Sequence, residues 1–470
     1  MGKNKRVILK VAKLMTCGVL LIMLPFVYWQ ILAAPRLNEN PGNPRHTAHR
    51  LRVQRGGIYA RGGEVIARSN REGEVYLRDY PVLLPGLAPT IGYFSSRYGL
   101  SGLEASLNQE LSGAKEQQTL RGWWRAEALG ESLPGQDVYT TIDLGIQAAA
   151  EAALGGRAGA VVALAPETGE ILAMVSGPGF DLRQVDKTWE DLVEHPDSPF
   201  LNRPIQGLYP PGSAFKILIL AAALESGAIG FGYTFNDQGK ITVSGHEIEN
   251  YGGKAYGHLD LYSALAVSSN VAFVEIGQKL GEEGLRSAAE GFGIGRDLNL
   301  RLPYRSGRLA PDKMSPTELA EESIGQGKLL VTPLEMALIT AVIANQGGLP
   351  EPILVKAIRD SAGNLVYFHR PKMIGYPISR QVANFVREAM VKVVKDGTGK
   401  AAAVPNLEVA GKTGTAENPH GRSHGWFVGF APAYDPEILV AVIVENGGGG
   451  GTVAAPIARR VIEAALSSSH

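Results

Sequence analysis

Apolar positions change their spacing several times along the chain, and each change predicts a different element. The run Leu14–Ala34 is apolar with few interruptions, and its 21 residues at 1.5 Å each would span about 31 Å, roughly one bilayer core. Two short β-like runs flank Gly62-Gly63, which predicts a hairpin within residues 55–67. Residues 99–111 predict a turn entering an amphipathic helix, and residues 139–154 predict a strand followed by a helix.

From residue 158 the pattern is different. Gly159–Leu164 and Ile171–Ser176 are β-rich runs joined by Pro-Glu-Thr-Gly, a strong hairpin signal. Ser213–Glu225 is nearly continuous in apolar residue types and is long enough for a buried helix. The chain ends with two predicted strands and a helix, over residues 425–430, 438–445 and 453–466. Strands at both ends and helices between them predict an α+β domain in which both ends feed one sheet.

The distribution of charge along the chain predicts how the apolar span is oriented in a membrane. The chain has 46 basic and 46 acidic residues, and the lack of a basic surplus argues against a partner bound through nucleic-acid phosphates. Residues 1–13 carry five bases and no acid, which leaves the remainder with a net charge of −5. Bases before an apolar span predict a single-pass protein with its N-terminus in the cytoplasm. The alternative is a cleaved signal peptide, although no clear cleavage site lies beyond Ala33-Ala34.

The predicted organisation therefore has four parts. These are a cytoplasmic tail (1–13), a transmembrane helix (14–34), a linker with a small module (35–150) and a larger domain (151–470). The single cysteine, Cys17, lies in the predicted span, so the exported part has no thiol for a disulfide or for catalysis. The nine histidines form no His-Glu-x-x-His pattern, and we predict no metal and no cofactor.

The first candidate for chemistry is Ser213-Ala-Phe-Lys216, which follows Pro210-Pro211-Gly212. Positions i and i+3 share a helix face, so Ser213 and Lys216 are expected to be neighbours. Lys216 stands in an otherwise apolar stretch, where desolvation favours a neutral amine that can take a hydroxyl proton. A helix start also offers free backbone N–H groups to an oxyanion. The structural alternative is that Ser213 is only a helix cap and that Lys216 extends to the surface.

Two further motifs follow. Ser268-Ser-Asn270 comes after an apolar run, and it offers a hydroxyl and an amide; its alternative is an ordinary turn. Lys412-Thr-Gly-Thr415 comes after a strand-like pair, with Gly414 leaving room for a substrate backbone and Thr413 and Thr415 offering hydroxyls to a carboxylate. Its alternatives are a glycine-rich bend and a nucleotide-binding loop, but Asn406 stands where such a loop needs glycine.

Each motif is weak alone, but their order resembles that of the penicillin-binding proteins and serine β-lactamases. Residues 159–176 look like the opening hairpin of that family, and Gly397-Thr-Gly399 and His424-Gly-Trp426 look like its later landmarks. Arg55-Gly-Gly-Ile and Gly102-Leu-Glu104 resemble the N-terminal module of the monofunctional, class B members. The resemblance implies an antiparallel sheet flanked by helices, a helical subdomain and a small dimerisation or pedestal-like module.

The resemblance also implies an activity, that of a D,D-transpeptidase that cross-links peptidoglycan and binds β-lactams. Ser213 would attack the stem peptide, Lys216 would be the base, and Ser268 would relay protons to the leaving D-Ala. Substrate would be held by Lys412 and by four further residues: Asn270, Thr413, Gly414 and Thr415. Alternatives are a D,D-carboxypeptidase and a catalytically idle β-lactam sensor or division scaffold. The family further implies a bacterial cytoplasmic-membrane location, with the catalytic domain outside, and a polytopic glycan polymerase as partner.

Overall fold

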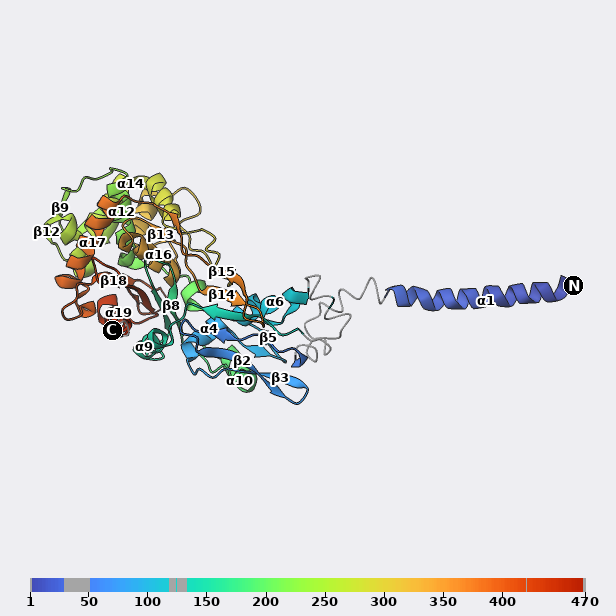
Figure 1. Cartoon of the computed structure of the whole chain (residues 1–470). Coiled ribbons are helices and arrows are strands. Elements are labelled where there is room, and N and C mark those ends of the chain that lie inside the picture. Colours follow the sequence, from blue (N-terminus) through green and yellow to red (C-terminus); the bar gives the residue numbers. More distant parts are fainter. Residues whose placement is uncertain (1, 29–50, 118–123, 125–132, 420, 468–470) are drawn as a thin grey trace.

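The computed structural model describes residues 2–28, 51–117, 124, 133–419 and 421–467. Helix α1 (Gly2–Val27) begins the chain, and two sheets with their helices form the main body (Figure 1). Among the described helices, none is both long and apolar enough to cross a bilayer. The predicted span extends to Ala34, so its last residues lie outside the described part of the chain.

A five-stranded antiparallel sheet forms the centre of the larger domain. Its strand order joins both ends of the domain: β17 (Ala410–Ala416), β18 (His424–Ala431), β19 (Ile438–Val444), β7 (Gly159–Leu164) and β8 (Ile171–Gly177). The predicted hairpin is confirmed by the β7–β8 pairing, and the prediction that both ends feed one sheet is confirmed by the β19–β7 pairing. Every residue of β7, β8 and β19 is buried, because helices cover both faces.

The two faces of the sheet carry different helices. Helices α9 (Leu144–Leu154) and α19 (Ala455–Ser467) pack on the face that includes Val161 and Val440. Helix α16 (Pro333–Ala344) packs on the opposite face and joins a helical subdomain there. Its other helices are α12 (Lys216–Glu225), α13 (Leu261–Val267), α14 (Asn270–Gly291), α15 (Pro316–Ser323) and α17 (Arg380–Lys395).

Short elements connect these layers. Two antiparallel strand pairs lie beside the helical subdomain: β9 (Thr234–Asp237) pairs with β12 (Gly257–Asp260), and β10 (Lys240–Val243) forms a hairpin with β11 (His246–Glu249). The 3₁₀ turn η4 (Gly212–Phe215) leads into α12. Other short elements are η2 (Pro85–Leu87), α4 (Ala88–Ile91), β4 (Phe94–Ser95), β5 (Gly99–Leu100), α5 (Gly102–Ser106), α6 (Asn108–Leu111), α7 (Ala114–Gln117), α10 (Val185–Glu194), α11 (Arg203–Gln206), η5 (Tyr251–Gly253), β13 (Leu349–Pro350), β16 (Met373–Gly375), η6 (Lys400–Ala402) and α18 (Gly450–Val453).

The second sheet combines strands from distant parts of the sequence. Strands β1 (Ile58–Tyr59), β2 (Val65–Glu72), β3 (Val75–Asp79) and β6 (Asp137–Thr140) come from the N-terminal module, and the predicted hairpin around Gly62-Gly63 is confirmed by the β1–β2 pairing. The sheet is completed by β14 (Val355–Arg359) and β15 (Leu365–Phe368), which pair in the order β15-β14-β6-β1-β2-β3. In Figure 1 these orange strands lie beside the blue module, although they come from a much later part of the sequence.

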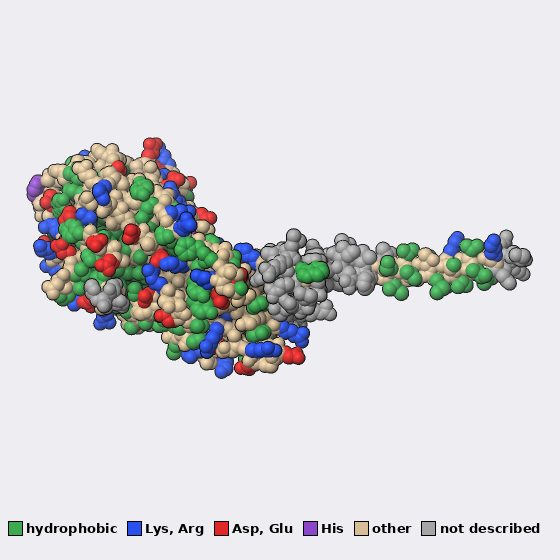
Figure 2. All heavy atoms as spheres, in the orientation of Figure 1, with side chains coloured by type: hydrophobic (Ala, Val, Ile, Leu, Met, Phe, Trp, Pro, Cys, Tyr) green, Lys and Arg blue, Asp and Glu red, His purple; other side chains and the backbone are tan. Residues whose placement is uncertain are grey.

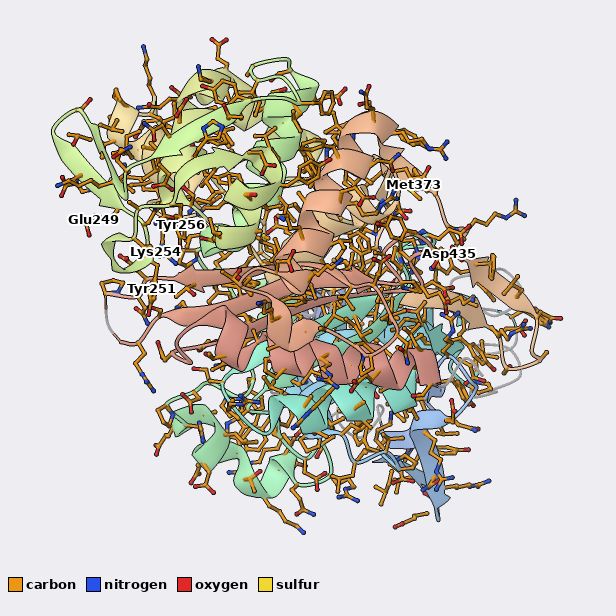
Figure 3. All side chains as sticks on the ribbon, turned by 90° about the vertical axis from the view of Figure 1, so that its left-hand side faces the viewer. Glu249, Tyr251, Lys254, Tyr256, Met373 and Asp435 are labelled. Carbon is orange, nitrogen blue, oxygen red and sulfur yellow. The ribbon has the colours of Figure 1, made fainter. Side chains whose placement is uncertain are left out.

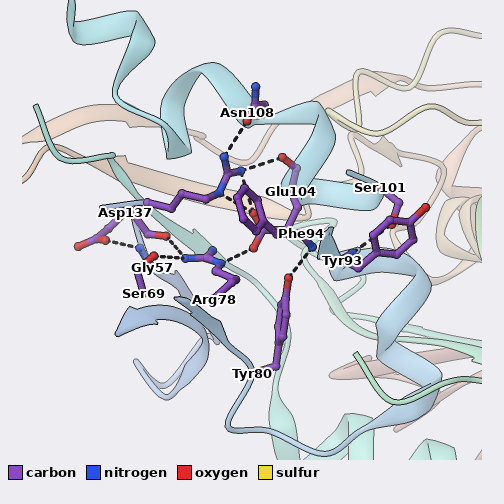
Figure 4. Close-up of polar contacts among 12 residues, drawn as sticks. Gly57, Ser69, Arg78, Tyr80, Tyr93, Phe94, Ser101, Glu104, Asn108 and Asp137 are labelled. Atoms are coloured by element: carbon purple, nitrogen blue, oxygen red, sulfur yellow. Dashed lines mark hydrogen bonds and ion pairs between the residues drawn. The ribbon is translucent and has the colours of Figure 1, made fainter. Parts of the chain in front are cut away.

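A buried ion cluster lies in the N-terminal module, where the two family-like motifs meet (Figure 4). Glu104 from α5 is fully buried and accepts hydrogen bonds from Arg55 Nη2 at 2.8 Å and from Arg78 Nε at 2.6 Å. Arg55 also donates to Asn108 Oδ1 at 2.7 Å, and Arg78 donates to the Gly56 carbonyl at 2.7 Å. The cluster ties a helix to the sheet, so the Arg-Gly-Gly-Ile and Gly-Leu-Glu motifs have a structural role here.

The surface of the main body has no single dominant charge on the face that Figure 2 shows. Acidic and basic side chains are interspersed there, which agrees with the zero net charge of the sequence.

Candidate functional site

Ser213 lies on the tight turn that precedes helix α12. Gly212 has φ +54°, and a β-carbon there would come 2.5 Å from the carbonyl oxygen of Thr415, so only glycine allows this approach. The Gly212 amide donates to the Gly325 carbonyl at 2.8 Å and fixes the turn from its other side. The Ser213 side chain remains partly exposed and lines a large cleft, while Ala214 and Phe215 behind it are buried.

Lys216 is the first residue of α12, one turn after Ser213, and it is fully buried. Its Nζ donates to the Ser268 carbonyl at 2.8 Å, the Ser269 carbonyl at 3.3 Å and Asn270 Oδ1 at 2.8 Å. Ser268 Oγ lies 3.4 Å from the same nitrogen. The structure therefore brings the first two motifs into direct contact and leaves Lys216 directed into the site, not toward solvent.

The Ser268–Asn270 turn joins two helices. Ser268 ends α13 in the left-handed region, with φ 60° and ψ 41°, and Ser269 caps α14 by accepting from the Ala272 amide at 3.0 Å. A left-handed conformation is unfavourable for serine and persists because the surrounding contacts hold it. Asn270 Nδ2 donates to the Glu249 carbonyl at 2.7 Å, so its oxygen is the atom that faces Lys216.

The third motif forms strand β17, beside the turn that carries Ser213. Lys412 is fully buried, and its Nζ donates to Ser268 Oγ at 2.9 Å and to the Thr413 carbonyl at 2.9 Å. Thr413 and Thr415 line the same cleft as Ser213. A β-carbon at Gly414 would come 2.7 Å from the Pro211 carbonyl oxygen, so glycine lets the Ser213 turn pack directly on the strand.

Ser268 Oγ thus lies between two buried lysines. Burial and the neighbouring charge of Lys412 hold the pKa of Lys216 well below its ordinary value of 10.5. Burial lowers the pKa of Lys412 to about 7. The carbonyl and amide oxygens around Lys216 favour its ammonium form and oppose the effect of burial.

The cleft in front of these residues has a volume of about 1410 Å³. Its floor includes Ser213, Ser268, Asn270, Thr413 and Thr415. Its rim is formed by side chains from the end of β11, from the β11–β12 connection and from the loop after β17, among them Glu249, Tyr251, Tyr256, Glu417 and Arg422. In Figure 3 Glu249, Tyr251 and Tyr256 lie together in the light-green segment next to the five-stranded sheet. The cleft is large enough for an extended peptide alongside β17.

Some residues of the site had no role assigned from sequence. Thr398 Oγ1 lies 2.6 Å from Thr413 Oγ1, and the Gly397-Thr-Gly399 string was the signal that marked it. Trp426 Nε1 donates to the Pro210 carbonyl at 3.0 Å and supports the turn before Ser213. Asp237 and Asn250 lie behind the Ser268–Asn270 turn and carry no recognisable motif. The described residues contain no group of three or more His, Cys, Asp or Glu side chains arranged to hold a metal ion.

Comparison with known proteins agrees with this geometry. Residues 159–463 match the model of the penicillin binding protein transpeptidase domain, and residues 55–138 match that of the penicillin binding protein A dimerisation domain. The peptidoglycan D,D-transpeptidase PbpA of Mycolicibacterium smegmatis is 36% identical over 93% of this chain and 94% of its own length. PbpA of Mycobacterium tuberculosis H37Rv is 37% identical, over 95% of this chain and 96% of its own.

Solved structures give the same result. The ceftriaxone acyl-enzyme complex of penicillin-binding protein A from M. tuberculosis is 35% identical, covers 89% of this chain and 100% of its own, and has a TM-score of 0.82. The D,D-transpeptidase domain of a peptidoglycan glycosyltransferase from Eggerthella lenta is 35% identical, covers 89% and 99%, and has a TM-score of 0.81. The chain therefore belongs to the penicillin-binding proteins, in their class B of peptidoglycan D,D-transpeptidases.

Proposed function

We propose that Ser213 is the residue of this peptidoglycan D,D-transpeptidase that becomes acylated. Lys216 would be the base that takes the Ser213 proton. Ser213 Oγ would attack the carbonyl carbon of the penultimate D-Ala of a stem peptide while its proton passes to Lys216. The peptide C–N bond would then break, and Ser268 would relay that proton to the leaving D-Ala amine. The observation that carries the proposal is the convergence of three distant motifs on Ser268 Oγ, 2.9 Å from Lys412 Nζ and 3.4 Å from Lys216 Nζ.

The remaining motif residues suit the binding of the donor peptide. Thr413 and Thr415 offer hydroxyls at the cleft, and Lys412 adds positive charge behind them when it carries the proton of the lysine pair, a combination that suits a terminal carboxylate. Gly414 lets the backbone of β17 approach the Ser213 turn, so the amides of Ser213 and Thr415 can serve one oxyanion. Asn270 would hold the substrate amide. An amine of a second stem peptide would then attack the ester carbon and release Ser213.

The same serine would react with β-lactams. The relative from M. tuberculosis, 35% identical, has been solved as a ceftriaxone acyl-enzyme complex, and the buried lysine pair supports the same reaction in this chain. The first test is labelling of the full-length, detergent-purified protein with a fluorescent penicillin, followed by peptide mapping. We expect one stable adduct on Ser213 and none in Ser213→Ala. A folded wild-type protein that forms no adduct would contradict the proposal.

A second assay separates the transpeptidase from a carboxypeptidase and from a sensor. The wild-type protein is given a D-Ala-D-Ala stem peptide together with an excess of an amine acceptor, and the products are measured by mass spectrometry. A transpeptidase gives the cross-linked product and free D-Ala. Hydrolysed donor alone would identify a carboxypeptidase, and a stable penicillin adduct without turnover would identify a sensor.

For location, the proposal is that residues 14–34 anchor the chain in the bacterial cytoplasmic membrane, with residues 1–13 inside. The five bases of residues 1–13 and the apolar composition of the following segment support it. The N-terminal module and the anchor are the proposed contacts of a polytopic glycan polymerase. Protease protection of spheroplasts tests the topology, since residues 51–467 should be digested from outside. Site-specific crosslinking from module surface positions tests the partner.

A further inference from the structure

Behind the Ser268–Asn270 turn lies a buried carboxylate that the proposed reaction does not use. Asp237 ends strand β9 and is fully buried. Its Oδ1 accepts from the Gly239 amide at 2.8 Å and from Asn250 Nδ2 at 2.8 Å. Its Oδ2 accepts from Asn250 Nδ2 at 2.9 Å and from Ser269 Oγ at 2.6 Å. Both carboxylate oxygens therefore accept hydrogen bonds from neighbouring groups.

The orientation of Asn250 supports this assignment. Its Oδ1 accepts from the backbone amides of Asn270 at 2.7 Å and Val271 at 3.2 Å, so its Nδ2 must be the group that faces Asp237. Asn250 and Ser269 thus link Asp237 to the start of α14. Through them the carboxylate holds the turn that presents Ser268 Oγ and Asn270 Oδ1 to Lys216.

Asp237 has no cationic side chain in direct contact among the residues that the structure describes; its nearest links to charge run through the turn. Lys216 Nζ donates to the Ser269 carbonyl at 3.3 Å, and Ser269 Oγ donates to Asp237. Two charged groups act on Lys216, Lys412 from β17 and Asp237 from β9, while the Phe273 ring from α14 lies 5.3 Å from its Nζ. Two lysines and one carboxylate, all fully buried, carry the least net charge when the pair of lysines holds one proton.

We infer that Asp237 is a positioning residue that fixes the Ser268–Asn270 turn and supplies the negative charge that keeps one proton on the Lys216–Lys412 pair. The inference rests on the proposed function, because it concerns the base of that reaction. One lysine can then accept the Ser213 proton while the other remains an ammonium group toward Ser268 Oγ or the substrate carboxylate. Without the carboxylate, the ammonium form becomes less favourable in the buried site.

The test is the pH dependence of penicillin acylation in Asp237→Asn. Loss of the carboxylate removes attraction for the lysine proton, so the acidic limb of the acylation profile should move to lower pH by about half to one unit. In Asp237→Asn, the new side-chain amide would face the side-chain amide of Asn250. Asp237→Ser is therefore a second neutral variant, which lacks this amide–amide contact. Both variants remove a buried charge, so both are expected to fold, and thermal melting checks this.

Ser269→Ala is the matched control, since it breaks the link to the turn and leaves the carboxylate charged. It should lower the acylation rate at every pH, by about fivefold, without moving the limb. Folded neutral variants with an unshifted limb would overturn the inference, as would an equal shift in Ser269→Ala. Loss of folding in both neutral variants would make Asp237 a structural residue and would also overturn it. Failure of the wild-type protein to acylate on Ser213 is a different result, which contradicts the proposed function itself.

Discussion

Two buried clusters in this molecule each combine two cationic side chains with one carboxylate, and they differ in how close the opposite charges lie. In the N-terminal module, Glu104 contacts Arg55 at 2.8 Å and Arg78 at 2.6 Å. In the larger domain, Lys216 and Lys412 flank Ser268, and Asp237 contacts neither lysine directly but is linked to Lys216 through Ser269. The guanidinium groups of Arg55 and Arg78 keep their protons, and direct contact with Glu104 compensates their charge. Separation leaves lysines whose proton can move, which is what a base requires.

The largest effect on penicillin acylation is expected from a change in the lysine cluster itself. Lys216→Met removes the proposed base while filling its buried space, so penicillin acylation should fall by about 10³- to 10⁴-fold. The same change removes a desolvated amine but leaves the Ser268 and Ser269 carbonyls and Asn270 Oδ1 without their donor, so the two effects on stability oppose each other. Stopped-flow labelling gives the rate and thermal melting gives the stability. Acylation within tenfold of wild type would show that another group takes the Ser213 proton.

Disrupting the cluster of Glu104 with its two arginines should instead lower stability and leave penicillin acylation nearly unchanged. Glu104→Ala leaves Arg55 and Arg78 buried without their counter-charge, which should lower the free energy of unfolding by about 3–5 kcal/mol. Urea denaturation measures it, and the exposed Glu74→Ala in the same module is the control. Penicillin acylation of the folded fraction should stay near wild type. A loss below about 1 kcal/mol would mean that the cluster is solvated or relaxes easily.

The pH dependence of acylation and of stability tests the lysine cluster further. With the pKa of Lys412 at about 7, acylation should fall about tenfold per pH unit below that value as the site takes up a proton. Between pH 7 and 10.5 the unfolded chain binds a proton on Lys412 that the folded chain lacks, so the contribution of Lys412 to stability rises with pH. Lys412→Met should therefore be more stable than wild type at pH 7, by a margin that shrinks by about 1.4 kcal/mol per unit. A margin that is constant with pH would contradict the assignment.

The smallest effect concerns a neutral contact. Thr398→Val removes the hydroxyl that meets Thr413 at 2.6 Å and should cost about 1 kcal/mol, or about fivefold in acylation. Thr452→Val is the control, because Thr452 lines the same cleft but bonds the Gly449 carbonyl. Rates of the two variants are compared at one pH. Equal losses in both would mean that the Thr398 contact adds nothing specific.

Local patterns predicted most of the larger domain. The β7–β8 hairpin, the buried α12 and the late strands follow from apolar runs and turn residues within a few positions of each other. The helix predicted from Ser213 begins instead as the 3₁₀ turn η4, because Gly212 with φ +54° and the contact with β17 shape this start. The motif residues could be grouped because the family order ties three weak signals together.

The residues that were missed act over long sequence distances. Asp237 stands in an ordinary strand, and its importance comes from hydrogen bonds to Asn250 and Ser269, which no local spacing indicates. Strand β14 joins the N-terminal sheet by pairing with β6, more than two hundred residues earlier, and β15 joins it by pairing with β14. Alternation of apolar residues predicts that a segment is a strand but not which edge it joins. The Arg55–Glu104 contact likewise joins residues 49 positions apart.

The β6–β14 pairing also sets an order of events during synthesis. Strands β1, β2, β3 and β6 leave the ribosome early, but the partner for β6 is made only after most of the larger domain. At 5–20 residues per second this delay is about 10–40 seconds. Through that interval one edge of β6 has no strand beside it, a state that favours pairing with other chains. The N-terminal module therefore completes its sheet only after β14 has been made.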